Sequence, residues 1–375
     1  MNAGRTTFFP VLLALAFAPG CKFDIDLGGL GGTDDGSWGE EAVETGDDDP
    51  PPPPSEEPDR LTQVAVPGAV WSVAWYTSTE IDAADVGPQG LALTGGRDAA
   101  LLSVETGLPI WTVLELDDGN ESRVRVLDDQ VVWARAETGE SWEMRGYNEF
   151  GVLVSASELG HASDMFELDE AALPYVASNL QLLGVDPSDG AVVWTAAPES
   201  PAQVFAVSPR IDGVYALEVV DGDDLEAIPY RLRPFTSDGT ELETTEYVVD
   251  GSLAQDVVTA GEAGELVVVL ENNYLWAGRV RALEPGTGDL LWAVAVPGFS
   301  SLEIAADPNG DVLVLVAPNE APAELLRISP AGEVVETRAA THVPVRHAIL
   351  AVGDGGEIVV GGRDSTGTLR LNRLE

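Results

Sequence analysis

Glycine turns that open a short apolar run recur along this sequence every 39 to 49 residues. Three of them read Gly-x-x-x-Trp, in the segments GLPIW, GAVVW and GDLLW. A glycine that permits a tight turn before a β-prone run is typical of a hairpin. The turn glycines are Gly107, Gly151, Gly190, Gly239, Gly288 and Gly332, with ETGE at 137–140 as an alternative to Gly151. A period of this length indicates a repeat architecture whose unit holds four short strands.

A second series of glycine turns keeps step with the first. Its members are Gly90, Gly213, Gly264, Gly310 and Gly356, each before an apolar run such as VYALEVV or DVLVLV. No convincing stretch of helical periodicity interrupts these runs. We therefore predict an all-β fold, a single β-propeller of seven four-stranded blades, with six or eight blades as alternatives.

The last predicted blade lacks an outer strand, because the chain ends where a seventh turn of the first series would fall. The start of the repeat region, RLTQVAVPG at 60–68, matches WAVAVPG at 292–298, which the repeat alignment assigns to an outer strand. We expect this N-terminal strand to pair with the C-terminal blade and to close the ring. Closure hides strand edges that would otherwise favour aggregation.

The tryptophans of the repeated segments, Trp111, Trp194 and Trp292, fall in alternate repeat units. The other units carry Ser155, Glu243 and Glu336 at this position. A tryptophan side chain buries roughly 200 Å² when it packs, so we predict that the three rings pack between neighbouring blades. An aromatic platform for a ligand is the alternative interpretation.

The charge balance is strongly acidic. The chain has 64 Asp and Glu residues against 19 Lys and Arg, for a net charge of -45. Such a field repels the phosphates of nucleic acids, so nucleic-acid binding is disfavoured. The 45% hydrophobic content can supply a large core. The single cysteine, Cys21, excludes an internal disulfide and a cysteine-based metal cluster.

Residues 1–20 have the pattern of a secretion signal, with a basic Arg5, an apolar segment from Phe8 to Ala18, and small residues before Cys21. The apolar segment is too short to span a bilayer, which takes about 20 residues. The pattern resembles the signal of bacterial lipoproteins, with APGC as the lipobox. This resemblance implies a signal peptide over 1–20 and a lipid on Cys21. Ordinary secretion, with cleavage after ALA at 14–16, is the alternative.

The segment after the signal has the composition of a disordered linker. Residues 21–60 are rich in Gly, Asp and Glu and contain five consecutive prolines at 50–54. Little apolar surface is present to offset chain entropy, so we predict an extended tether that precedes a propeller over 61–375. By the lipoprotein resemblance, Lys22 rather than Asp after the cysteine favours the outer membrane over the inner membrane.

Two repeat units carry a family resemblance. The segments VRALEPGTGDLLWAVAVP at 280–297 and LLGVDPSDGAVVWTAAP at 182–198 resemble blades of the pyrroloquinoline-quinone-like repeat family, and the resemblance covers 61–375. It implies a β-propeller. The quinone-dependent dehydrogenases of the wider family use a calcium-bound cofactor and an adjacent cysteine pair. This chain has no cysteine pair and no matching constellation, so we expect no cofactor.

Few residues suggest chemistry. The three histidines, His161, His342 and His347, are isolated, and the last two would point to opposite faces of a strand. The acidic turns DPNGD at 307–311 and DGDDLE at 221–226 offer oxygen ligands for calcium. Asp and Asn also favour turns without any metal, so only weak binding of divalent cations is expected. We predict no catalytic, cofactor-binding or metal-binding residues.

These features together predict a function. We expect an envelope-anchored lipoprotein, attached to the membrane through Cys21, whose propeller is a non-catalytic platform for a protein partner. The location is the outer membrane in preference to the inner one, with the periplasmic and surface-exposed sides both open. The alternative is an extracellular propeller that binds or degrades a polysaccharide or another ligand with acidic site residues.

Overall fold

A computed structural model describes the repeat region of the chain. The described residues are 61–63, 69–76, 81–95, 98–114, 119–137, 142–159, 165–169, 171–178, 181–198, 202–210, 212–220, 228–249, 252–261, 266–273, 277–297, 299, 301–318 and 320–374. All regular elements in them are β-strands, so the all-β prediction is confirmed. No helix in these ranges has the length and apolar character needed to cross a membrane. The predictions for the signal, for Cys21 and for the tether lie outside the described residues.

Five blades are separate four-stranded antiparallel sheets in which the strands follow one another in chain order. Blade 1 contains β3 (Ile81–Gly87), β4 (Gly90–Gly95), β5 (Asp98–Leu102) and β6 (Pro109–Leu114). Blade 2 contains β7 (Gly119–Val126), β8 (Val131–Glu137), β9 (Trp142–Tyr147) and β10 (Leu153–Glu158). Blade 3 contains β11 (Met165–Leu168), β12 (Pro174–Ser178), β13 (Gln181–Val185) and β14 (Val192–Ala196).

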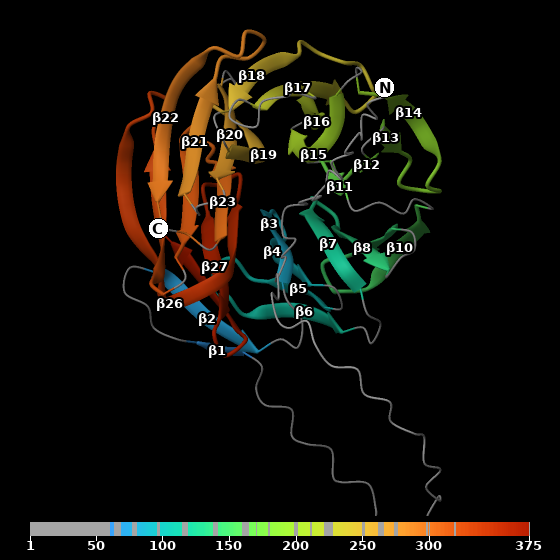
Figure 1. Ribbon diagram of the computed structural model, residues 1–375. Helices are drawn as coiled ribbons and strands as arrows, with labels where there is room; N and C mark the ends of the chain where they lie inside the picture. The colour runs from blue at the N-terminus through green and yellow to red at the C-terminus, as the bar shows by residue number, and fades with distance from the viewer. Residues whose placement is uncertain are drawn as a thin grey trace, which may run out of the picture.

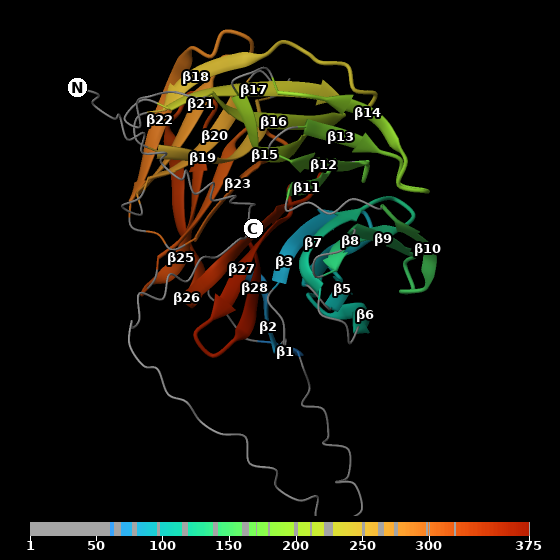
Figure 2. The ribbon, with the colours of Figure 1, turned by 45° about the vertical axis from the view of Figure 1, so that its right-hand side comes forward.

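The other two separate blades follow the same plan. Blade 4 contains β15 (Ala202–Arg210), β16 (Gly213–Val220), β17 (Ile228–Thr236) and β18 (Thr245–Val249). Blade 5 contains β19 (Ser252–Ala260), β20 (Leu266–Asn273), β21 (Ala277–Leu283) and β22 (Leu290–Pro297). In each blade the first strand lies innermost and the fourth lies at the outer edge, and Figures 1 and 2 show the blades arranged in a ring.

The remaining strands form one eight-stranded sheet, in the order β1-β2-β28-β27-β26-β25-β24-β23. These strands are β1 (Leu61–Gln63), β2 (Ala69–Tyr76), β23 (Ser301–Ala306), β24 (Val312–Ala317), β25 (Pro322–Ile328), β26 (Val334–Val352), β27 (Ile358–Asp364) and β28 (Thr368–Leu374). The prediction of seven four-stranded blades is therefore wrong, since five blades are separate. The physical reason is β26, a 19-residue strand whose first part pairs with β25 and whose second part pairs with β27.

The N-terminal strand does pair with the C-terminal sheet, but it is not the strand that the sequence comparison selected. Strand β2 pairs with β28, with Val73 opposite Leu371, and β1 lies outside β2. The closing strand is therefore 69–76 rather than 60–68. Figure 2 shows β2 beside β28. The N-terminal and C-terminal strands thus share one sheet, as expected.

The glycine turns lie where the repeat predicted them. All six glycines of the first series connect the third and fourth strands of a unit and have a positive φ, for example 69° at Gly107 and 84° at Gly239. Gly151, with a φ of 73°, is the turn of blade 2 in preference to ETGE. In the second series Gly213 and Gly310 connect first and second strands, whereas Gly264 lies outside the described residues.

Apolar side chains fill the seams between neighbouring blades. The seam between the eight-stranded sheet and blade 1 buries Trp71, Val73, Leu91, Leu93 and Leu371, among others. Strands that are covered on both faces read as continuous apolar runs, and all six residues of β24 are buried. Each fully buried Leu or Val contributes about 1.5–3 kcal/mol through removal of its surface from water. The ring is held together by these seams.

Candidate functional site

The three tryptophans of the repeat pack between blades, as predicted. The ring of Trp194, on β14, stacks on Phe235 of blade 4 at 5.6 Å between centroids, and its Nε1 donates a hydrogen bond to the Ser237 carbonyl at 3.0 Å. Trp292, on β22, donates in the same way to the Pro330 carbonyl at 2.9 Å. Trp111, on β6, is 8% exposed and packs near Tyr147 of blade 2. These rings lie in the seams, away from the axis of the ring.

A fourth tryptophan of this kind escaped the sequence comparison. Trp71, on β2, is 7% exposed and donates a hydrogen bond to the Val104 carbonyl of blade 1 at 2.6 Å. Its local sequence, GAVW at 68–71, differs from GAVVW at 190–194 by one missing residue. A repeat search that allowed one deletion would have identified it, and would have placed the closing strand correctly.

Each of these rings rests on a turn glycine of the next unit. A Cβ on Gly239 would lie 2.5 Å from the ring of Trp194, and one on Gly332 would lie 2.5 Å from the ring of Trp292. Glycine is therefore required at these turns for two reasons: it adopts a positive φ, and it leaves room for the indole. Each tryptophan of the repeat thus packs on the turn glycine of the following unit.

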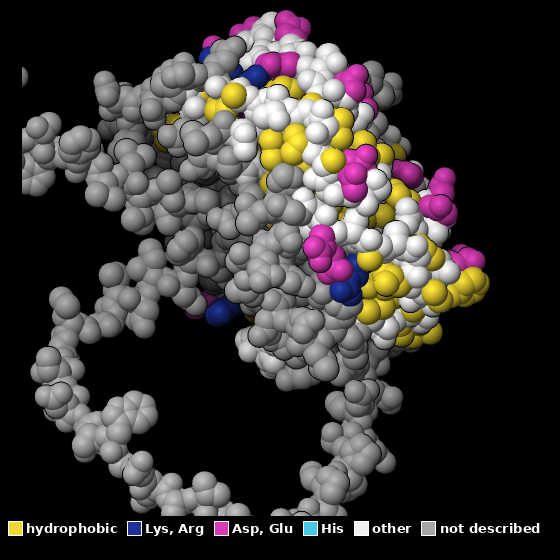
Figure 3. Space-filling view, turned by 90° about the vertical axis from the view of Figure 1, so that its right-hand side faces the viewer, with side chains coloured by type: hydrophobic (Ala, Val, Ile, Leu, Met, Phe, Trp, Pro, Cys, Tyr) yellow, Lys and Arg dark blue, Asp and Glu magenta, His cyan; other side chains and the backbone are white. Residues whose placement is uncertain are grey.

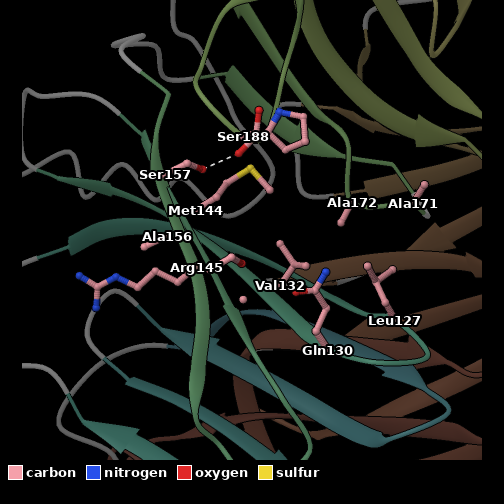
Figure 4. Close-up of a pocket in the computed structure, with 13 residues that line it drawn as sticks. Leu127, Gln130, Val132, Met144, Arg145, Ala156, Ser157, Ala171, Ala172 and Ser188 are labelled. Carbon is pink, nitrogen blue, oxygen red and sulfur yellow. Dashed lines mark hydrogen bonds between the residues drawn. The ribbon is translucent and has the colours of Figure 1, made fainter.

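In the seam between blades 2 and 3, Trp142 of β9 stacks on Phe166 of β11 at 4.0 Å between centroids. Between the same blades lies a pocket of about 390 Å³ (Figure 4). The outer-strand position that holds tryptophan in blades 1, 3 and 5 is Ser155 in blade 2. The pocket is lined by Leu127, Gln130, Val132, Met144, Arg145, Gly146, Ser155, Ala156, Ser157, Ala171, Ala172, Pro187 and Ser188. Its volume falls within the range of about 300–1,000 Å³ that is typical of small-molecule sites.

A polar cluster occupies the centre of the ring. Its members come from the innermost strands of four sheets: Arg123 on β7, Glu167 on β11, Asp256 on β19 and Glu303 on β23. Arg123 Nε donates to Glu167 Oε2 at 3.2 Å, and both side chains are buried. Ser208 Oγ donates to Asp256 Oδ1 at 3.0 Å. The charged groups interact across blades 2, 3 and 5 and the eight-stranded sheet, and the Ser208 hydrogen bond adds blade 4.

Two carboxyls of this cluster have raised pKa values. Burial raises the pKa of Glu303 to about 8; the charge of Asp256 adds to the rise, and Arg123 opposes it. Burial raises the pKa of Asp256 to about 6, against hydrogen bonds from the Val257 N–H and the Ser208 hydroxyl. At neutral pH the pair therefore favours a protonated Glu303 next to an ionised Asp256. Sequence reasoning missed this cluster, although a charged residue within the apolar first strand of several repeats was a usable signal.

The residues that the sequence singled out for metals do not converge. Asp307 and Asp311 of the DPNGD turn both accept hydrogen bonds from Arg327, so a guanidinium lies where a cation would bind. Across the residues that the structure describes, no group of three or more His, Cys, Asp or Glu side chains could hold a metal ion. His342 is exposed and His347 lies at a bulge of β26 with a φ of 51°. His161 and the turn at 221–226 lie outside the described residues.

Exposed aliphatic side chains recur directly after the turn glycines, and we call them the aliphatic rim. They are between 40% and 63% exposed. The rim consists of Leu108, Ile110, Val152, Leu153, Val154, Val192, Val193, Leu242, Leu290, Leu291, Val334 and Val335. Because every unit repeats the same strand order, these turns lie at the same end of each blade. Figure 3 looks at the side that carries β10 and β14 and shows hydrophobic side chains exposed there among acidic ones.

Comparison with known proteins identifies the fold. No family model and no curated protein matches the chain. The crystal structure of BamB from Moraxella catarrhalis is 12% identical with a TM-score of 0.47, covering 84% of this chain and 100% of that one. A protein of unknown function from Bacteroides caccae is 13% identical with a TM-score of 0.45, covering 66% of this chain and 94% of that one.

A third similar structure is a chain from the crystal structure of a mitotic checkpoint complex. It is 12% identical with a TM-score of 0.54, and the match covers 91% of this chain and 99% of that one. A sequence identity this low supports a shared fold but does not support a shared function. The sheets of the structure, supported by this likeness, make the chain a β-propeller.

Proposed function

We propose that this protein is an envelope lipoprotein of the pyrroloquinoline-quinone-like repeat type, whose propeller binds protein partners without catalysis. The observation that carries the proposal is the aliphatic rim. Val193 is 63% exposed and Leu291 is 49% exposed, at equivalent places in blades 3 and 5. Single exposed aliphatic residues are ordinary, but a recurring set at one end of the blades is typical of a protein-binding surface.

The composition of the rim fits a protein partner better than a polysaccharide. Sugar-binding sites would need polar groups and aromatic faces that converge on one region. Here the repeat tryptophans are engaged in the seams, and the central carboxyls Glu167 and Asp256 are engaged by Arg123 and Ser208. The rim instead offers branched aliphatic side chains, which pack against an apolar protein surface.

Membrane attachment through Cys21 is part of the proposal. The test is metabolic labelling of the full chain with a fatty-acid analogue, followed by fractionation of the inner and outer membranes. We expect label on the wild-type chain in the outer-membrane fraction and none on Cys21→Ser, which should be found in the soluble fraction. Equal labelling of both chains would refute lipidation at this residue.

Partner binding is tested with rim variants of the full chain, purified from native cells after chemical crosslinking. A double variant, Val193→Thr with Leu291→Thr, replaces exposed apolar groups and should change stability by no more than about 0.5 kcal/mol per site. We expect it to recover envelope proteins in reduced yield. The matched control is Val248→Thr, which is 51% exposed on β18 but lies away from the turn glycines. Equal recovery by the rim variant and the wild type would contradict the proposal.

A further inference from the structure

Strand β10 is the open outer edge of blade 2. It pairs with β9 on one side, and within the described part of the chain no strand pairs with its other side. Figure 2 shows it at the outside of the ring. Five of its six residues are exposed. The backbone N–H and C=O groups along the open side are therefore available to another strand.

This edge lacks the features that protect the other outer strands. Proteins commonly shield a strand edge with proline, with charged side chains or with a covering segment. Pro109 begins β6, Glu246 lies within β18 and Pro297 ends β22. In β14 the Trp194 ring reaches across to blade 4. The segment FGVLVSAS at 150–157 contains neither proline nor a charged residue.

The start of this edge exposes large apolar side chains. Phe150 is 74% exposed, and the three residues at 152–154, which belong to the aliphatic rim, are each at least 50% exposed. The pairing of β10 with β9 is then regular from Ser155 to Glu158. The side chains at 155–157 are small and leave the strand backbone open to approach. An added strand would gain apolar contacts at the start of β10 and backbone hydrogen bonds along the rest of it.

Four carboxylates flank the edge. Glu149 lies just before the apolar residues and Glu158 ends the strand, and both side chains are exposed. The turn of blade 3, which contains Asp186 and Asp189, rests against the end of β10, where its Pro187 carbonyl accepts a hydrogen bond from the strand (Figure 4). The apolar edge is therefore bordered by negative charge at both ends.

The protein itself does not neutralise these charges. None of the four carboxylates forms an ion pair within the described part of the chain. Hydrogen bonds from the Ser188 hydroxyl and N–H lower the pKa of Asp186, so this carboxyl is ionised at neutral pH. Arg145 of the neighbouring strand β9 is engaged by Glu143, with 2.9 Å between Nε and Oε1. The flanking charge is thus left to attract a cationic partner.

We propose that β10 accepts an extended segment of a partner protein in which aliphatic residues alternate with Lys or Arg, added as a fifth strand to blade 2. The inference rests on the proposed function and names the chemistry of the partner segment. Successive side chains of an extended segment point to opposite faces. One face therefore packs on the apolar residues of β10, and the other presents cations to the carboxylates.

Charge also decides between this occupant and two others. The net charge of -45 disfavours a second copy of the chain, because like charges repel. The same repulsion disfavours the chain's own residues 22–60, which are rich in Asp and Glu. A basic partner segment gains from the field that opposes both.

Defined peptides test the proposal with the full chain. The probe is a fluorescent seven-residue peptide of alternating lysine and valine, and the two controls replace every lysine with glutamate or every valine with threonine. By fluorescence anisotropy we expect the probe to bind at least about tenfold more tightly than either control, and to weaken as salt is raised because ions screen the charges. Similar binding of the three peptides would overturn the proposal.

Amide hydrogen exchange separates strand addition from a diffuse attraction between charges. An added strand forms hydrogen bonds with the outward N–H groups of β10, so exchange over 153–158 should slow by at least about fivefold when the probe is bound. Exchange over 245–249, on the outer strand β18, should stay unchanged. Probe binding without protection of β10, or equal protection of both strands, would contradict strand addition.

A matched pair of variants locates the binding. Val154→Lys and Val248→Lys each place a lysine on an outer strand, at valines that are 55% and 51% exposed, and they change the net charge equally. We expect Val154→Lys to weaken probe binding at least about fivefold, because it removes an apolar contact and repels the cationic peptide. Val248→Lys should weaken it less than about twofold. Equal weakening by the two variants would exclude β10 as the site.

The chain without peptide tests the two other occupants. Protection of β10 in the chain alone would overturn the choice of a partner segment. If that protection were lost in Val154→Lys together with a dimer seen by sedimentation, the occupant would be a second copy. If it were lost on deletion of 22–58, the occupant would be the chain's own segment.

These results are distinguishable from a failure of the proposed function. Probe binding is measured without any envelope protein, so it is independent of the recovery of partners from cells. Reduced recovery by the Val193→Thr and Leu291→Thr double variant, together with no binding of the probe, would remove the inference about β10 and leave the proposed function standing.

Discussion

Replacing Glu303 with glutamine should make the domain more stable at high pH and leave it nearly unchanged at low pH. Burial and the charge of Asp256 raise the pKa of Glu303 from 4.5 to about 8. The folded state therefore favours the protonated carboxyl, whereas the unfolded state ionises it above pH 4.5. Folding takes up a proton between these two values, so the stability of the wild type falls as pH rises through this window. Glutamine has the shape of the protonated form and cannot ionise.

The size of the effect follows from the difference between the two pKa values. One pKa unit corresponds to 1.36 kcal/mol, so a rise from 4.5 to about 8 sets a ceiling of roughly 5 kcal/mol. The Glu303 side chain keeps partial contact with solvent, which screens the charge. We therefore expect Glu303→Gln to gain about 2–4 kcal/mol over the wild type at pH 9. At pH 4.5 the two proteins should differ by less than about 0.5 kcal/mol.

Chemical denaturation of both proteins at several pH values between 4.5 and 9 tests this prediction. The difference between variant and wild type is the quantity to compare, because the net charge of -45 makes both proteins pH-dependent. Asp256→Asn serves as a companion variant, with its gain expected at lower pH because the pKa of Asp256 is about 6. A stability difference for Glu303→Gln that stays constant across the range would refute the reasoning.

Three further predictions concern the seams and the closure. Trp194→Ala should cost about 3–5 kcal/mol in the free energy of unfolding, since it removes a ring between blades and a hydrogen bond; a loss below about 1 kcal/mol would mean that the seam does not depend on it. Gly239→Ala should cost about 1–3 kcal/mol more than Gly356→Ala. Both glycines have a φ near 83°, but a Cβ at 356 meets nothing within 4 Å whereas one at 239 meets the tryptophan ring. If both variants lost the same free energy of unfolding, backbone strain alone would explain the cost, and the contact with the tryptophan ring would not contribute. Deleting 69–76 should lower the melting temperature far more than deleting 22–58, and similar melting temperatures would contradict closure by β2.

The repeat made much of the fold predictable. The positions of turn glycines such as Gly107 and Gly332 can be predicted from the sequence, because a tight turn requires a positive φ at one residue. This requirement depends only on the local chain and not on distant contacts. The seam positions of Trp111, Trp194 and Trp292 were readable for the same reason, since each follows its glycine at a fixed distance. The closing strand was misplaced because the match of 60–68 relied on apolar similarity, while the better signal at Trp71 had one residue fewer.

Other features depend on contacts that no local pattern encodes. The eight-stranded sheet arises because β26 passes from one pairing to the next without a glycine turn, which a search for turns cannot register. The polar cluster joins Arg123 to Glu167, 44 residues apart, and brings Asp256 and Glu303 to them from other sheets.

Site-specific photocrosslinking of the full chain in native cells is the most direct test of the interaction surface. A photoreactive side chain at Val193 or Leu291 lies on the aliphatic rim, and one at Val248 serves as an equally exposed control. The account predicts that both rim positions capture the same envelope protein and that the control position does not. Capture at all three positions alike, or capture of polysaccharide alone, would contradict it.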